Sequence, residues 1–229
     1  MRSLFVGLVA LVMTVVLAPV VIVAGLFRVP QGPDSIYSRC VRRWARAVNG
    51  AAGVRVRVHG DRAPSGQGAV YVSNHVSWFD IFALAAEVVG IVFLDRDNRK
   101  AAFESYEVAA GAVQGGRSII VCPEGTRGLD YHLRPFKKGP FVFAIASQAS
   151  VIPTIVHGAR EVMPKGTFRI RPGVVDLHFL EAIPTAGLDY EARAELTTTV
   201  WSVMADALRR LYGVSSSERA IAAAGERQE

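Results

Sequence analysis

The chain has 229 residues, of which 51% are hydrophobic, and a formal net charge of +6, so general disorder is excluded and one α/β core fits its length. Its two cysteines, Cys40 and Cys122, give no zinc spacing and predict no disulfide in a cytoplasmic domain. A basic protein can bind nucleic acid, but no recognised nucleic-acid motif occurs, and we expect no such partner.

Residues 1–30 predict a membrane anchor. Positions 3–27 hold no charged side chain, and a helix of that length, rising about 1.5 Å per residue, crosses about 30 Å of hydrocarbon. A cleaved signal peptide is the alternative, but the stretch exceeds a usual apolar h-region and no convincing small-x-small cleavage site closes it. Pro19 leaves another option, in which two half-helices enter and leave the same leaflet. We therefore expect a membrane helix or a helical hairpin.

Residues 31–53 predict a basic amphipathic helix at the membrane interface. Positions 28–62 carry eight arginines against two aspartates, whereas Arg2 alone precedes the apolar run. The positive-inside rule then places the following domain on the cytoplasmic face of the membrane. On a helix over 35–49, apolar side chains share one face and four arginines lie opposite. We favour contact of this helix with anionic membrane phospholipid; a core-packed helix with a solvated basic face is the alternative.

Residues 54–213 predict a single α/β domain with a mixed sheet flanked by helices. Strand and helix signals alternate along it. Strands are expected at 54–58, 69–72, 91–94, 118–122 and 151–156, a hairpin at 168–171 and 174–180 around Pro172-Gly173, and helices at 81–89, 98–114, 141–148 and 190–212. The alternating pattern of 54–58 is typical of an edge or half-exposed strand. Gly213 ends the last helix, and 214–229 predict a mobile tail.

The sequence Asn-His-Val-Ser-Trp-Phe-Asp at residues 74–80 predicts a catalytic pair. On one continuous helix His75 and Asp80 would point roughly 140° apart, so the chain must bend between them if they are to meet. With His75 in the loop after a strand and Asp80 near a helix start, the carboxylate can hold one imidazole nitrogen and leave the other to take a proton. A helix-capping aspartate and an ordinary loop histidine are the alternative reading. Ser77 is a weak nucleophile candidate because no G-x-S-x-G elbow surrounds it.

A second polar motif, Pro-Glu-Gly-Thr-Arg at residues 123–127, suits a phosphorylated ligand. Arg127 offers a planar fork for phosphate, and Gly125 lets the backbone approach a ligand closely. Glu124 is expected to orient an acceptor hydroxyl or Arg127; an ordinary turn with a Glu124–Arg127 ion pair is the alternative. Further candidates for substrate binding are Thr126 within the motif, Arg96, and the pair Lys137 and Lys138. No metal site is expected, because His59, His132, His157 and His178 show no ligand pattern.

The two motifs resemble those of the glycerolipid acyltransferases typified by 1-acylglycerol-3-phosphate acyltransferase, whose first motif is N-H-x-S-x-x-D. Residues 93–96, 123–127 and 151–154 are similar to the family's second, third and fourth blocks, and 133–139 to the stretch after the third. The resemblance covers about residues 54–185. One departure is the interval of nine residues between Asp80 and Gly90, which is shorter than in the family.

The resemblance implies direct acyl transfer without a cofactor. His75, oriented by Asp80, would activate the free hydroxyl of a lysophospholipid acceptor for attack on an acyl thioester, with acyl-CoA or acyl-carrier protein as donor and phosphatidate as product. Arg127 and Arg96 would hold the acceptor phosphate. Other acceptors, such as glycerol phosphate or an acylated amino-acid lipid, and a catalytically impaired membrane lipid-binding protein stay open as alternatives.

Overall fold

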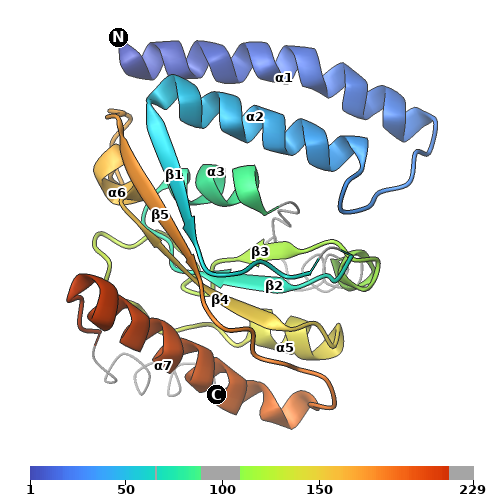
Figure 1. The fold of residues 1–229 in the computed structure, drawn as a ribbon, viewed down its shortest axis with the longest axis vertical. Helices are drawn as coiled ribbons and strands as arrows, with labels where there is room; N and C mark the ends of the chain where they lie inside the picture. The colour runs from blue at the N-terminus through green and yellow to red at the C-terminus, as the bar shows by residue number, and fades with distance from the viewer. Residues whose placement is uncertain (65, 89–108, 217–229) are drawn as a thin grey trace.

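A computed structural model describes residues 1–64, 66–88 and 109–216, and in this part five strands form one sheet in the order β1-β5-β4-β2-β3 (Figure 1). The strands are β1 (Val54–His59), β2 (Val70–Ser73), β3 (Ile119–Val121), β4 (Val151–His157) and β5 (Gly173–Phe179). β4 and β5 pair antiparallel, and the other neighbours pair parallel. The predicted mixed sheet is therefore confirmed, and β1 lies at its edge as expected.

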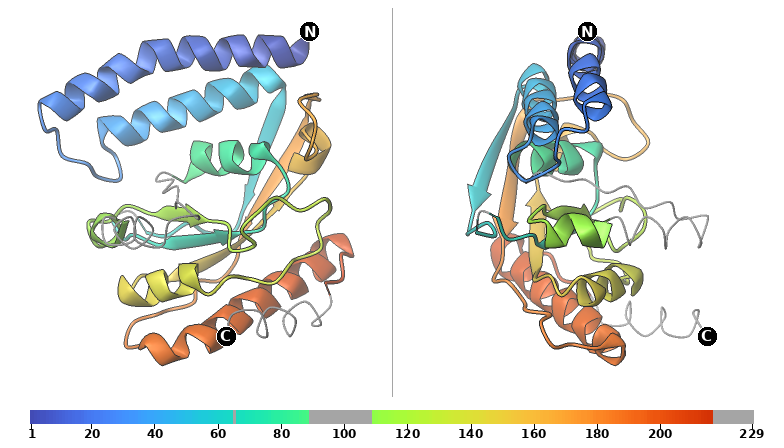
Figure 2. Two further views of the ribbon diagram at one scale, coloured as in Figure 1. Left: turned by 180° about the vertical axis from the view of Figure 1, so that it is seen from behind. Right: turned by 90° about the vertical axis from the view of Figure 1, so that its right-hand side faces the viewer.

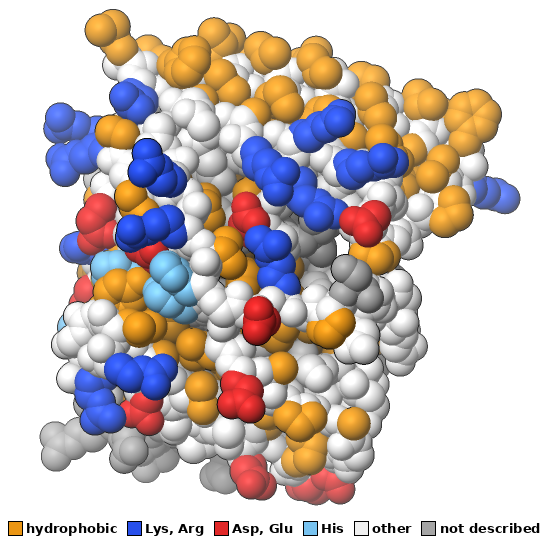
Figure 3. Space-filling model, viewed as in Figure 1, with side chains coloured by type: hydrophobic (Ala, Val, Ile, Leu, Met, Phe, Trp, Pro, Cys, Tyr) orange, Lys and Arg blue, Asp and Glu red, His pale blue; other side chains and the backbone are white. Residues whose placement is uncertain are grey.

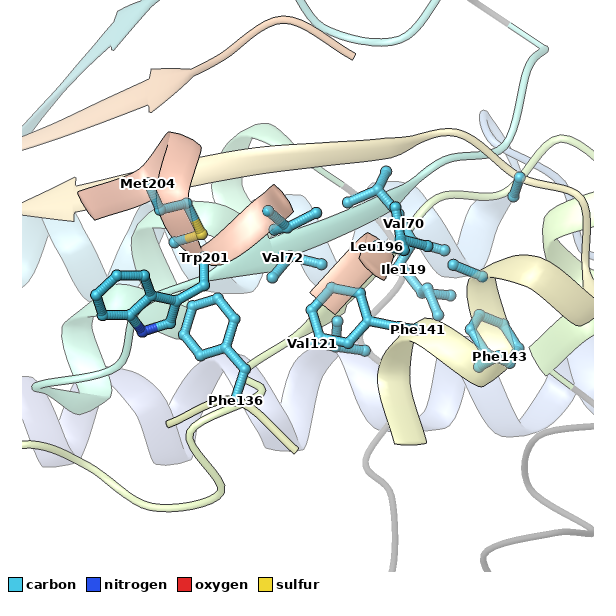
Figure 4. Packing of buried hydrophobic residues seen from close by; sticks show 14 of the residues in the cluster. Val70, Val72, Ile119, Val121, Phe136, Phe141, Phe143, Leu196, Trp201 and Met204 are labelled. Atoms are coloured by element: carbon cyan, nitrogen blue, oxygen red, sulfur yellow. The ribbon is translucent and has the colours of Figure 1, made fainter. Parts of the chain in front are cut away.

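Helices cover both faces of the sheet (Figures 1 and 2). One face carries α2 (Ile36–Ala52), α3 (Trp78–Glu87) and α6 (Ala159–Val162); the other carries α5 (Gly139–Ala146) and α7 (Arg193–Tyr212), which the short 3₁₀ helix η1 (Tyr190–Ala192) precedes. Side chains of β2 pack against the helices on both faces of the sheet, because successive strand residues point to opposite faces. Val70 and Val72 pack with α5 and α7, as Figure 4 shows, whereas Tyr71 packs with α2 and α3.

The N-terminal helix α1 (Arg2–Leu26) is continuous through Pro19 and lies antiparallel along α2 (Figure 1). At one end the Arg2 guanidinium donates to the Ala52 carbonyl, and in the middle the Trp44 indole donates to Thr14 Oγ1 at 3.0 Å. The helix is long and apolar enough to cross a membrane, by length and composition. A break at Pro19 into two half-helices is not formed; the hairpin of this structure consists of α1 and α2.

Most of the apolar stripe of α2 is covered by protein, although Val41 is 39% exposed. Ala45, Val48 and Ala52 are buried beside α3 and the sheet, and Trp44 contacts α1. The arginines of α2 lie on the outer side, and Figure 3 shows basic side chains in a band below the apolar row along the top of the molecule. On α2, the arginine face and Val41 are therefore the parts that lipid can contact.

The predicted hairpin around Pro172-Gly173 is wrong. No strand forms over 168–171; this segment is a loop held by bonds from Ile170 N to Ser3 Oγ and from Arg171 N to the Val162 carbonyl. β5 pairs instead with β1, far away in the chain, and with β4. The expected strand at 91–94, most of the expected helix at 98–114 and nearly all of the expected tail lie outside the described residues; 109–114 are helical and end at Gly115-Gly116, where Gly116 has φ +83°.

Candidate active site

The two sequence motifs meet at one edge of the sheet. β2 and β3 are parallel, so the loops that follow Ser73 and Val121 leave the sheet on the same side, where open α/β sheets place their ligands. Asn74 fixes the start of the first loop, because its side-chain amide donates to the Val156 carbonyl at 2.9 Å and accepts from Val156 N–H at 2.8 Å. The amide thus satisfies both backbone groups of Val156, which a longer β2 would otherwise pair.

His75 and Asp80 are in contact because α3 begins between them. Ser77 caps the helix, accepting from Phe79 N–H, and Asp80 occupies its first turn. One carboxylate oxygen, Asp80 Oδ2, lies 3.0 Å from His75 Nδ1 and also accepts from the backbone N–H groups of Val76 and Ser77. With a proton on Nδ1, His75 Nε2 is the ring nitrogen that can accept a proton from a substrate.

Burial sets the electrostatics of this pair. Asp80 is fully buried and His75 is 8% exposed. Burial raises the pKa of Asp80, and the bonds from His75, Ser77 and Val76 oppose that rise. Its second oxygen, Oδ1, is buried with no hydrogen-bond partner in the described part of the chain. The negative charge that orients His75 is therefore held almost wholly through Oδ2.

Glu124 positions His75 through the backbone. Its Oε1 accepts from His75 N–H at 3.0 Å, while Arg134 Nε lies 3.4 Å from Oε2. The Gly128 N–H in turn donates to the His75 carbonyl at 2.7 Å, so Glu124 of the second motif and the residue that follows the motif bind both backbone groups of His75. Burial raises the pKa of Glu124, opposed by the His75 N–H and by Arg134. The ion-pair partner of this carboxylate is thus Arg134, and the Glu124–Arg127 pairing considered from the sequence is not the one formed.

The Arg127 guanidinium lies over the Trp78 ring, 5.1 Å from its centroid. Trp78 is 42% exposed, so this stack borders solvent. Lys165, from the loop after α6, donates to the Arg127 carbonyl at 2.7 Å. Trp78, Lys165 and Arg134 were not predicted as site residues from the sequence. Arg134 could have been found, because it lies within the 133–139 stretch that carries part of the resemblance. Lys165 lies 38 residues from Arg127, and no sequence pattern indicates their contact.

The remaining predicted residues of the second motif border the same loop. Gly125 has φ +79°, and a Cβ atom there would come within 2.8 Å of Lys137 Cε, so the Lys137 side chain lies against this glycine. Thr126 is exposed, and its carbonyl accepts from Arg134. Arg96 lies outside the described residues. The structure therefore places Arg127 and Lys137 on the loop that contacts His75.

Ser77 has a structural role. Its side chain is fully buried, accepts from Phe79 N–H, and donates to the Met163 carbonyl at 2.8 Å. Both hydroxyl interactions belong to the helix cap and to the loop after α6. This hydroxyl is consequently not placed to act as a nucleophile.

Two of the scattered histidines are brought together by the sheet register. His59 of β1 pairs with His178 of β5, the two rings stack at 4.3 Å, and Asp176 lies beside them with ligand atoms within 4.8 Å of one another. Arg57, however, binds Asp176 through two hydrogen bonds of 2.8 Å. Burial would raise the pKa of Asp176, but the bonds from Arg57 and His59 lower it overall. A cation already neutralises this carboxylate, so the cluster fits a metal ion poorly.

Comparison with known proteins agrees with the site. Residues 84–157 match the family model named Acyltransferase. Over 158 residues the chain is 28% identical to 1-acyl-sn-glycerol-3-phosphate acyltransferase of Limnanthes douglasii, covering 58% of this chain and 56% of that protein. It is also 28% identical over 162 residues to the human alpha enzyme of that name, covering 59% of this chain and 57% of the relative.

The chain is thus similar to proteins of the acyltransferase family. Its fold is similar to that of PlsC, the 1-acyl-sn-glycerophosphate acyltransferase of Thermotoga maritima, with a TM-score of 0.67 and 23% identity over 93% of this chain and 100% of that one. This likeness shows the fold of the chain. The chain spans little more than half the length of the curated relatives named above.

Proposed function

We propose that this protein is an acyltransferase that transfers an acyl group from a thioester to the free hydroxyl of 1-acylglycerol-3-phosphate, giving phosphatidate. The observation that carries the proposal is the 3.0 Å contact of His75 Nδ1 with buried Asp80. The loop that carries Arg127 binds the backbone of the same histidine. The names of the similar proteins support the choice of acceptor.

The reaction needs one base and no covalent enzyme intermediate. His75 Nε2 takes the proton of the acceptor hydroxyl while its oxygen attacks the thioester carbonyl. The tetrahedral intermediate collapses, the carbon–sulfur bond breaks, and the leaving thiolate takes the proton from His75. Asp80 stabilises the imidazolium between these steps and keeps Nδ1 protonated. No cofactor is required, and acyl-CoA or acyl-carrier protein supplies the thioester.

The basic side chains beside His75 suit the acceptor phosphate. Arg127 presents a planar guanidinium on Trp78, and Lys137 crosses Gly125 on the same loop. A bidentate guanidinium–phosphate contact both neutralises the charge of a substrate phosphate and fixes its orientation. Holding the acceptor here places its hydroxyl near one base and turns a collision into an intramolecular step.

The packing of α1 favours insertion in the plane of the membrane over a perpendicular span. α1 lies along the length of α2. If α1 crossed about 30 Å of hydrocarbon in this arrangement, the α2 arginines would lie inside the hydrocarbon, where charged side chains are costly. An in-plane α1 instead buries its exposed apolar residues while the α2 arginines stay at the headgroups. We assign the protein to the cytoplasmic face of the membrane, with α1 as the anchor.

The test is acyl transfer from labelled long-chain acyl-CoA, or acyl-carrier protein, to 1-acylglycerol-3-phosphate in vesicles. We expect turnover by the intact chain and a loss of about 10²–10⁴-fold in His75→Ala and Asp80→Asn, because the general base is removed or left unoriented. His132→Ala is the matched control, since His132 is exposed and pairs only with Asp130 among the described ion pairs.

Circular dichroism and vesicle binding establish that the variants keep the fold and the anchor. Unchanged turnover in His75→Ala would overturn the mechanism. Lipid binding by the intact chain without turnover of either thioester would overturn the enzymatic proposal, and turnover with another acceptor alone would overturn the choice of 1-acylglycerol-3-phosphate.

A further inference from the structure

The loop between α6 and β5, residues 163–172, carries an unusually exposed aromatic side chain. Phe168 is 86% exposed, and among the large apolar side chains of the described residues only Met1 is more so. Burying a phenylalanine is worth about 1.5–3 kcal/mol, which this chain forgoes at Phe168 within its own fold. The ring is therefore available to another apolar phase.

The charges of the loop point to the chemistry of that phase. Lys165, Arg169 and Arg171 lie within residues 163–172, and no acidic residue does. An aromatic ring flanked by cations matches the interface of a bilayer with anionic headgroups, where the ring enters the acyl boundary and the cations meet phosphate. A protein partner with an apolar socket would not account for Arg169 and Arg171, which follow the ring closely in the chain and are both exposed.

The loop is continuous with the apolar surface of α1. Ile170 N–H donates to Ser3 Oγ at 3.1 Å, at the start of that helix. Both views of Figure 2 place the loop beside the N-terminal end of α1, and the right-hand view shows it extending past the helix. The exposed apolar residues of α1 include Leu4, Leu8 and Leu11. One bilayer surface can therefore contact the helix and the loop together.

The other end of the loop contacts the active site. Lys165 donates to the Arg127 carbonyl at 2.7 Å, and the Met163 carbonyl accepts from Ser77 Oγ at 2.8 Å. The loop thus joins both sequence motifs to the helix that enters the membrane. The position of this loop therefore constrains the position of Arg127.

We propose that residues 163–172 form a second membrane-contacting element, with Phe168 inserted below the headgroups and Arg169 and Arg171 on anionic phosphate. This element holds Arg127 at the level at which a lipid acceptor carries its own phosphate. The part concerning the acceptor rests on the proposed function; the membrane contact does not.

A fluorescence measurement tests the contact directly. Phe168→Trp is bound to phosphatidylcholine–phosphatidylglycerol vesicles with or without brominated acyl chains, and the signal of the unsubstituted protein is subtracted. Leu211→Trp is the matched control, because Leu211 is 40% exposed on α7, at the opposite end of the molecule from α1. We expect quenching at position 168 and none at 211. If the fluorescence of the tryptophan at position 168 is the same in brominated and in plain vesicles, as expected at position 211, the proposal is overturned.

A kinetic comparison tests the consequence for the site. Phe168→Ser and the double variant Arg169→Ser/Arg171→Ser should raise the KM for long-chain acceptor in vesicles about tenfold, and leave kcat/KM for a short-chain, water-soluble acceptor unchanged. Leu211→Ser should change neither value. Equal losses on both acceptors would mean that the loop only supports the fold of the site, which would overturn the proposal. An inactive parent protein would overturn the proposed function and leave the quenching result standing.

Discussion

At the scale of single residues, Trp78 defines how Arg127 is presented. It occupies the first turn of α3, one residue after the Ser77 cap, so the helix that begins at the catalytic pair also fixes the ring. A guanidinium over an exposed aromatic ring gains about 0.5–1 kcal/mol and lies flat against it. In the function we propose, this stack restricts the orientation of the Arg127 guanidinium before a substrate phosphate binds.

Trp78→Ala is expected to raise the KM for the acceptor about fivefold while changing kcat and the donor KM little, because the lost stack disorders Arg127 and not His75. Trp78→Phe should retain most of the affinity. Steady-state kinetics with each substrate varied in turn separates these terms. A fall in kcat at unchanged acceptor KM would contradict the positioning role.

The sequence allowed the His75–Asp80 contact to be predicted because it is local: five residues and one helix start determine it. The partners of Glu124 could not be predicted in the same way. His75 N–H and Arg134 reach Glu124 because β2 and β3 are neighbours and because the loop folds back on itself, and neither fact is visible from spacing alone. Lys165 is the extreme case, since its place depends on a loop of which residues 168–171 were predicted to be a strand.

At the scale of elements, Asn74 joins β2 to β4 beyond the last residue of the strand. Its amide is buried and makes both bonds to Val156. Such a side chain substitutes for backbone pairing at the point where β2 must turn toward α3. The loop that carries His75 therefore leaves the sheet from a fixed point.

Asn74→Ala is expected to lower the free energy of unfolding by about 2–4 kcal/mol, because it leaves the Val156 N–H and carbonyl unsatisfied in a buried place. Asn49→Ala is a matched control: Asn49 is also buried, but its amide makes one bond, to the Phe82 carbonyl, and a loss of about 1 kcal/mol is expected. Denaturant unfolding of both variants measures the difference. Equal losses would show that the pairing to Val156 contributes nothing special.

Whether a segment forms a helix or a strand could be predicted where a local sequence pattern determines it. Which other helix or strand that segment packs against or pairs with could not. That residues 36–52 form the helix α2 could be predicted, because apolar and basic side chains lie on opposite faces of it. That α1 packs over Trp44 of this helix could not be predicted from that pattern. Pro172-Gly173 has the composition of a hairpin turn, but β5 finds a better partner in β1, whose apolar residues match it in parallel register. Strand pairing is a property of the whole sheet, and local turn signals are weak evidence for it.

At the scale of the whole molecule, two half-buried histidines link the sheet to the last helix. His157 stacks on Tyr212 of α7 at 3.7 Å, and His178 Nε2 lies 2.6 Å from the hydroxyl of the same tyrosine. Burial lowers the pKa of both imidazoles from the ordinary value of 6.5, and the neighbouring His59 lowers that of His178 further. Protonation of either ring therefore opposes folding.

Thermal stability is expected to fall by a few degrees as the pH is lowered from about 7.5 to 5.5. The unfolded chain binds protons on these histidines near pH 6.5, whereas the folded protein binds them only at lower pH, so stability present above 6.5 is lost on acidification. His157→Phe keeps the stack and should flatten the dependence of Tm on pH, while the exposed control His132→Gln should not. An identical pH slope in His157→Phe and the parent would contradict this origin.

The position of α1 along α2 has a consequence for the growth of a membrane. For the reaction we propose, the anchor, the aromatic loop and the catalytic histidine all approach the lipid from one side. Each turnover then converts a single-chain lipid into a two-chain lipid within the same monolayer. The area of that monolayer increases while the opposite one stays constant, so lateral tension between the two leaflets builds until lipids cross from one to the other.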